Sequence, residues 1–124
     1  MLPRAHRLTS GRGFALAVRR GRRSPARTLV VHLWEPPADQ PADGADAQVG
    51  FVVSKAVGTA VDRNRVKRRL RALVAERLDR LPAGAVVAVR ALPSAAGASS
   101  LALGRDLDRA LDRMSGRDRA GAGA

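Results

Sequence analysis

Residues 51–74 read FVVSKAVGTAVDRNRVKRRLRALV and contain the end of a strand, a turn and most of a helix. Residues 48–55 alternate between apolar and small or polar side chains, which is typical of a strand. The small residues of 56–60 predict a turn. From there to about residue 80 the pattern predicts an amphipathic helix. One of its sides is apolar and should pack on a sheet, and it is formed by Val66, Leu70, Leu73 and Val74.

The other side of this helix is cationic. Six of the nine residues from Arg63 to Arg71 are positively charged and none is acidic. Like charges one turn apart destabilise an isolated helix by roughly 0.2–0.5 kcal/mol per pair. On a folded sheet the helix would instead present a rigid row of cations, whose repulsion is relieved when phosphates displace counterions. We therefore predict a nucleic-acid contact. The alternatives are a purely solvated helix and a helix lying on a membrane surface.

The flanking sequence predicts further elements. Residues 9–21 read as a helix that Thr9 or Ser10 caps and Gly21 ends. Strands are predicted over 27–35 and 84–91, with a short extra strand within 21–26. A last helix begins after Ser99 or Ser100 and ends near Met114. Its apolar stripe contains Leu103, Leu107, Leu111 and Met114, and its charged residues read as a solvated face.

This order, α-β-β-β-α-β-α, predicts an α+β fold in which helices pack on one mixed sheet as a two-layer α/β sandwich. We expect residues 1–114 to form one domain. We expect strands 27–35 and 48–55 to form an antiparallel hairpin across residues 36–47, which read as a flexible loop rich in Pro, Asp, Ala and Gly. Residues 115–124 predict a disordered tail.

Composition narrows the function. The net charge is +12, and the excess is concentrated in residues 1–35, at +7, and residues 51–81, at +6. Clustered cations of this kind favour a polyanionic partner. The chain has no cysteine, which excludes disulfides and cysteine-based zinc sites. No apolar run approaches the ~20 residues that span a bilayer. The N-terminus also lacks the apolar centre of a signal peptide, so we expect a cytoplasmic protein.

The segment FVVSKAVGTAVDRNRVKRRLR, residues 51–71, resembles the signature of the protein subunit of bacterial ribonuclease P. The matching features are the SK at a strand end, then VG-x-AV, then RNRVKRRLR. LPRAHRLTSGRGFALAVRRGRR, residues 2–23, is similar to the N-terminal helix region of that family. LPAGAVVAVRALPSAA and LGRDLDRAL are similar to its last strand and helix. The resemblance covers about residues 2–114.

The resemblance implies a ribosomal-protein-like domain with a left-handed β-α-β crossover. It also implies a role in removing the 5′ leader from precursor tRNA, an endoribonuclease reaction. By the same resemblance, the catalytic RNA of the holoenzyme would carry that reaction with Mg²⁺ that it binds itself, and the protein would be an accessory subunit. No catalytic residue, metal site, cofactor or small-molecule substrate is expected in the protein. The implied contact with the catalytic RNA is made by Arg63, Asn64, Arg65, Lys67, Arg68, Arg69 and Arg71.

The second implied contact is a cleft between the N-terminal helix and the sheet, which holds the single-stranded leader of precursor tRNA. By the resemblance, its residues here are Phe14, Val18, His32, Val52, Ser54 and Lys55. Three positions depart from the family pattern. Val18 and His32 stand where aromatics are common, and Ala56 replaces a second lysine. We expect weaker base stacking in consequence, because a valine offers no ring face.

Two other functions fit the basic helix. An RNA-binding module of the ribosomal-protein type would share the helix but would not need a cleft containing Phe14 and His32. A DNA-binding protein would place the helix in the major groove and read bases with Asn64 and Arg65. Neither His6 nor His32 has a partner in the sequence that would make it a general base.

Overall fold

The computed structural model describes residues 6–8, 11–37, 39 and 45–123, with side chains as far as Met114. The predicted order of elements is confirmed, including the short strand before residue 27. Short 3₁₀ helices occupy Lys55–Val57, Leu78–Arg80 and Pro93–Ala95. The main elements are α1 (Gly11–Arg20), β1 (Arg22–Pro25), β2 (Leu29–Trp34), β3 (Gln48–Val52), α2 (Ala60–Ala75), β4 (Val86–Ala91) and α3 (Ser100–Gly123).

The four strands form one mixed sheet in the order β1-β2-β4-β3. β2 is antiparallel to both β1 and β4, whereas β3 and β4 are parallel. The predicted hairpin between β2 and β3 is therefore wrong, because β4 lies between them. A strand buried on both faces reads as a continuous apolar run, and β4 has one: Val87, Ala88 and Val89 are all buried. The strand order also makes β3-α2-β4 the β-α-β unit of the fold.

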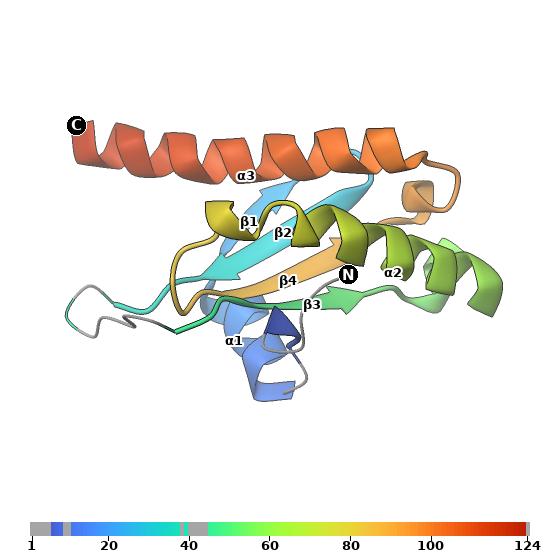
Figure 1. Cartoon of the computed structure of the whole chain (residues 1–124), viewed down its shortest axis with the longest axis horizontal. Helices are drawn as coiled ribbons and strands as arrows, with labels where there is room; N and C mark the ends of the chain where they lie inside the picture. Colours follow the sequence, from blue (N-terminus) through green and yellow to red (C-terminus); the bar gives the residue numbers. More distant parts are fainter. Residues whose placement is uncertain (1–5, 9–10, 38, 40–44, 124) are drawn as a thin grey trace.

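Helices cover both faces of this sheet (Figure 1). α2 and α3 lie on one face, together with the main core, and α1 lies on the other face against β2 and β4. The predicted apolar sides of the two long helices are confirmed. The α2 residues Val66, Leu70 and Val74 are buried, and so is the whole predicted stripe of α3. Full burial of such a side chain stabilises the fold by about 1.5–3 kcal/mol.

The ends of two helices differ from the prediction. α2 ends at Ala75, and a separate 3₁₀ turn, Leu78–Arg80, follows it. The backbone of α3 continues as helix to Gly123, where the sequence predicts a disordered tail after Met114. Alanine and arginine, which recur in this segment, are good helix formers. At its start, α3 is capped as predicted, because the hydroxyl of Ser99 accepts a hydrogen bond from the Ala102 amide at 3.1 Å.

Ion pairs fix α3 against the end of α2. Arg77 donates to both carboxylate oxygens of Asp108, at 2.6 and 3.2 Å, and Arg80 donates to Asp108 at 2.8 Å. Arg80 also contacts Asp112. This side of α3 is therefore not the solvated face that the sequence suggests. The pairing raises the pKa of Arg77 and, chiefly through the hydrogen bond from Arg77, lowers the pKa of Asp108.

Candidate nucleic-acid interface

The cationic helix begins at a well-defined cap. The hydroxyl of Thr59 accepts a hydrogen bond from the Asp62 amide at 3.2 Å, and the Asp62 carboxylate accepts one from the Thr59 amide at 3.1 Å. This is a capping box, which satisfies two backbone donors that a helix start leaves unpaired. The Asp62 carboxylate accepts hydrogen bonds from both the amide and the hydroxyl of Thr59, and these hold the pKa of Asp62 below its usual value. Gly58, at φ +153°, adopts a conformation that favours glycine and allows the chain to turn tightly into the helix.

Most of the predicted docking residues of α2 lie at the surface. Asn64, Arg68 and Arg71 are exposed, and Lys67 is half-buried. Among the described residues, Lys67, Arg68 and Arg71 have no hydrogen-bond or ion-pair partner. Arg65 lies 4.0 Å from Asp62, one turn earlier, in a weak ion pair. The helix therefore offers a group of cations whose charges are not neutralised by the protein.

Two of the predicted docking residues are less available at the surface than the others. Arg69 donates a hydrogen bond to the carbonyl oxygen of Ala98 at 2.8 Å, which ties α2 to the segment before α3. Arg63 is half-buried, and its Nε is enclosed without a hydrogen-bond partner among the described residues. Only part of the Arg63 side chain therefore lies at the surface.

A groove of about 400 Å³ runs along the edge strand β3 and connects α1 with α2. Phe14 lines it from α1, and Lys67 and Arg71 line it from α2. Arg7 and Leu8, which precede α1, also line the groove. The Leu8 amide holds this segment against β3 by donating a hydrogen bond to the Val49 carbonyl oxygen at 2.9 Å. Cations thus lie next to an aromatic ring in one hollow. The full lining consists of Arg7, Leu8, Phe14, Val49, Gly50, Phe51, Lys67 and Arg71.

The remaining predicted cleft residues are spread over the α1 face of the sheet and the chain after β3. Val18 is 50% exposed and Val52 is 37% exposed, so both present apolar surface to solvent. Val52 and His32 lie on the same face of the sheet. The strand ends at Val52, so Ser54 and Lys55 lie beyond it, in the exposed segment that leads into α2. None of these residues lines the groove at β3.

His32 differs most from its predicted role. It is only 6% exposed, and its Nδ1 has no hydrogen-bond partner in the described structure. Burial lowers the pKa of His32, and the nearby charges of Arg23 and Arg90 lower it further. The ring is therefore neutral at pH 7 and has little surface on which a base could stack. His32 therefore lies buried in the sheet beneath α1 and does not provide a surface for base stacking.

Two cations on this face were missed by sequence reasoning. Arg90 pairs in register with Val30 on one side and Val52 on the other, and Arg23 pairs with His32. Both arginines are exposed. A signal was present, because Arg90 interrupts the apolar run of β4 at a position that alternates with the core residues Val89 and Ala91. An arginine at such a position must point away from the core.

The described part of the chain contains no cluster of His, Cys, Asp or Glu that could hold a metal ion. Within the same residues no helix is both long and apolar enough to span a membrane. The surface assembled by α1, β3 and α2 is a cationic groove whose lining includes two aromatic residues, Phe14 and Phe51.

Comparison with known proteins matches this chain to the family model described as Ribonuclease P, over residues 2–115. The chain belongs to the ribonuclease P protein family. The ribonuclease P protein component of Nocardioides sp. is 58% identical over 116 residues, which cover 92% of this chain and 95% of that one. The corresponding protein of Streptomyces bikiniensis is 56% identical over 119 residues, covering 94% and 97%.

Solved structures share the fold. The RNase P protein of Staphylococcus aureus superimposes with a TM-score of 0.74 at 24% identity, covering 88% of this chain and 94% of that one. The RNase P protein of Thermotoga maritima, in complex with 1-(4-fluorophenyl)-2-thiourea, gives a TM-score of 0.72 at 22% identity, covering 86% and 98%. The protein is therefore a subunit of ribonuclease P and functions in tRNA processing. Family membership decides against the ribosomal-type module and the DNA-binding protein.

Proposed function

We propose that this ribonuclease P protein binds the catalytic RNA through α2 and the 5′ leader of precursor tRNA through the groove at β3. The observation that carries the proposal is the groove itself, in which Phe14 of α1 lies in one lining with Lys67 and Arg71 of α2. A single RNA strand needs both components, because its phosphates favour cations and its bases favour an aromatic face.

The cations of α2 supply the affinity for the catalytic RNA. Each phosphate that an arginine or lysine neutralises releases condensed counterions, so binding becomes tighter as salt is lowered. Arg68, Arg71 and Lys67 have no partner in the described protein, so no internal ion pair must break before they bind RNA. Arginine also presents a planar set of donors that matches two phosphate oxygens. The predicted contact set on α2 is Arg63, Asn64, Arg65, Lys67, Arg68, Arg69 and Arg71.

The protein positions the substrate and does not perform the chemistry. In this proposal the catalytic RNA cleaves the precursor at the mature 5′ end, with Mg²⁺ that the RNA binds. The protein holds the leader beside the RNA and neutralises phosphates, so that less Mg²⁺ is needed to offset their repulsion. The holoenzyme would act in the cytoplasm as a ribonucleoprotein.

Reconstitution tests this function directly. The protein would be mixed with a bacterial ribonuclease P RNA and a precursor tRNA at low Mg²⁺, and leader removal would be followed with and without protein. We expect cleavage at the mature 5′ end that depends on the protein. An absence of stimulation, while the protein still binds the RNA, would contradict the proposal and leave an RNA-binding protein without a role in cleavage.

A further inference from the structure

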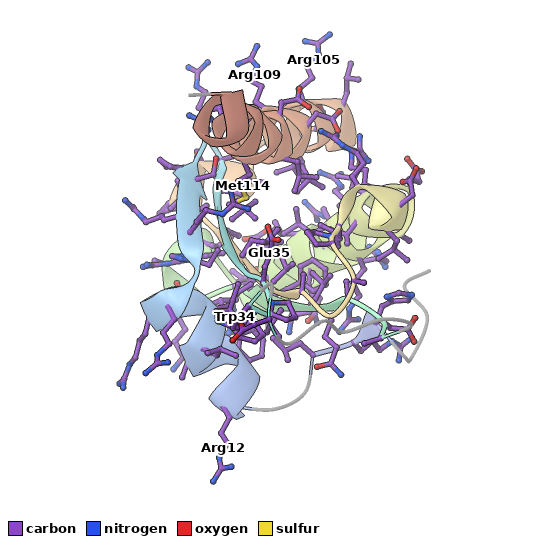
Figure 2. All side chains as sticks on the ribbon, turned by 90° about the vertical axis from the view of Figure 1, so that its left-hand side faces the viewer. Arg12, Trp34, Glu35, Arg105, Arg109 and Met114 are labelled. Atoms are coloured by element: carbon purple, nitrogen blue, oxygen red, sulfur yellow. The ribbon has the colours of Figure 1, made fainter. Side chains whose placement is uncertain are left out.

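The outer side of α1 carries cations that the leader groove does not use. Phe14 and Ala17 face the sheet, and Ala17 is completely buried. At 100° per residue, Arg12, Leu16 and Arg19 lie on the opposite side of the helix. Figure 2 shows Arg12 extending away from α1 and from the rest of the protein. The outer face of α1 is defined here as Arg12, Ala15, Leu16, Arg19 and Arg20, which line a shallow hollow of about 250 Å³.

Among the described residues, no acidic side chain pairs with the arginines of this face. The helix Gly11–Arg20 contains three arginines and no acidic residue. None of the three has a hydrogen-bond or ion-pair partner in the described part of the chain. Helix α3 is different, because it contains Asp108 and Asp112, which pair with the nearby Arg77 and Arg80. The outer face of α1 therefore resembles α2, where unneutralised cations are concentrated on one helix.

Helix stability does not account for Arg12. Arg19 and Arg20 lie in the last turn of α1, where the helix dipole favours positive charge. Arg12 lies in the first turn, where the dipole disfavours a cation and no acidic residue compensates. An external anion at this face would offset that cost, and its phosphates would meet Arg12 and Arg19 two turns apart, about 10 Å along the helix.

We propose that the outer face of α1 is a second docking surface for the catalytic RNA, which it binds through phosphates. This inference rests on the function proposed above. Helix α1 would then separate two RNA segments, with the leader on its inner side and the catalytic RNA on its outer side. An α-helix with its side chains is about 10–12 Å across, so the two sides of α1 contact different parts of any bound RNA.

Two observations favour the catalytic RNA as the occupant. α1 and α2 flank the same groove at β3, so a catalytic RNA that docks on α2 lies only one groove away from the cations of α1. In addition, once α2 is bound, contact with α1 becomes an intramolecular step at high effective concentration. Three arginine–phosphate contacts bind RNA weakly by themselves. Once α2 is bound, they are sufficient to hold the RNA on the outer face of α1.

A charge-matched pair of triple variants tests the proposal. The first is R12Q/R19Q/R20Q, and the control is R27Q/R105Q/R109Q, which removes the same charge from exposed arginines elsewhere. Arg105 and Arg109 project from α3 at the opposite end of the view in Figure 2. Binding to the catalytic RNA alone would be measured over a range of salt, with R68Q/R71Q on α2 as a third arm. Thermal unfolding would report whether each variant folds.

We expect R12Q/R19Q/R20Q to make the salt dependence shallower by about two to three units of slope, since each phosphate contact contributes roughly 0.7–0.9. The control should leave the slope unchanged. R12K/R19K/R20K should restore it, because lysine keeps the charge. This charge-retaining variant separates a loss of RNA contacts from a loss of folding.

The possible failures are distinguishable. If R68Q/R71Q weakens binding while R12Q/R19Q/R20Q behaves like the control, the second docking surface is wrong and the proposed function stands. If R68Q/R71Q has no effect either, the docking role of α2 fails as well. If R12Q/R19Q/R20Q instead weakens only the binding of mature tRNA to the assembled holoenzyme, the occupant is the tRNA body, which contradicts our assignment.

Discussion

The ring of Phe14 fills the space that a side chain at residue 50 would occupy: a β-carbon built on Gly50 would lie 2.2 Å from the Cζ atom of Phe14. Contacts this short are not tolerated, so one of the two groups must move. Phe14 is half-buried and lines the groove, so the absence of a side chain at residue 50 sets the depth at which the ring lies. The aromatic wall of the groove therefore depends on a glycine in β3.

Gly50→Ala should displace the Phe14 ring and lower the free energy of unfolding by about 1–3 kcal/mol, the usual cost of overpacking. Urea unfolding would measure this. Gly97→Ala is the matched control, because nothing lies within 4 Å of a β-carbon there. That variant should be neutral or stabilised by up to about 1 kcal/mol. Adding Phe14→Ala to Gly50→Ala should relieve the clash. If the two changes lowered the free energy of unfolding additively, no clash between residues 14 and 50 would exist.

Phe14→Leu should weaken the binding of precursor tRNA to the holoenzyme by roughly 5- to 150-fold, which corresponds to the ~1–3 kcal/mol of one base stacked on an aromatic ring. Leucine keeps an apolar side chain but has no ring face. Equilibrium binding of a leader-bearing precursor and of mature tRNA should be compared. Equal losses for both RNAs would show that Phe14 supports the fold and not the leader.

Arg68→Gln should weaken binding to the catalytic RNA and reduce the salt slope by about 0.7–0.9 unit, the contribution of one phosphate contact. Arg105→Gln on α3 removes the same charge from another exposed helix position and should leave the slope unchanged. A filter-binding or fluorescence titration at several salt concentrations suffices. Identical slopes for Arg68→Gln and Arg105→Gln would overturn the docking role of α2.

Arg69→Gln should behave differently from Arg68→Gln. Arg69 donates a 2.8 Å hydrogen bond to the Ala98 carbonyl oxygen, so its loss should lower the free energy of unfolding by about 1–2 kcal/mol. Its effect on the salt slope should be smaller than that of Arg68→Gln, because its guanidinium is already engaged. Chemical unfolding and RNA titration on the same samples would separate the two effects, and a stable variant with a full loss of slope would contradict this assignment.

Asp108→Asn should remove the negative charge that pairs with Arg77 and Arg80 and cost about 1 kcal/mol at neutral pH, at the upper end for exposed ion pairs. The pKa of Asp108 is lowered in the folded state. Its stabilising contribution is therefore present above the unfolded pKa of about 3.9 and is lost as the pH falls through the folded value. Unfolding from pH 7 to pH 2 should show a smaller pH dependence for the variant than for the wild type.

The local elements and their buried faces could be predicted from sequence because they depend on short-range patterns. The period of Val66, Leu70 and Val74 identified the buried side of α2. The strand order could not be predicted, because it depends on which strand is stabilised most by burial on both faces. The loop of residues 36–47 is also long enough to permit several arrangements.

The candidate site was only partly predictable for a similar reason. Exposure of the α2 cations follows from the helix period. The burial of His32 depends on where α1 packs, and the bond from Arg69 depends on where the segment before α3 lies. Both are contacts between elements distant in sequence. The exposure of Arg90 could have been predicted, because it lies between the core residues Val89 and Ala91 in β4.

The central position of β4 also has a consequence for synthesis on the ribosome. Its two neighbours, β2 and β3, both emerge before it, and β3 has no other strand partner in the described sheet. A nascent chain that ends before residue 86 therefore cannot assemble the sheet against which α2 packs. The growing chain already carries most of its positive charge at that stage. Its cationic surface acquires a fixed shape only when the last strand inserts, so selective RNA recognition begins late in translation.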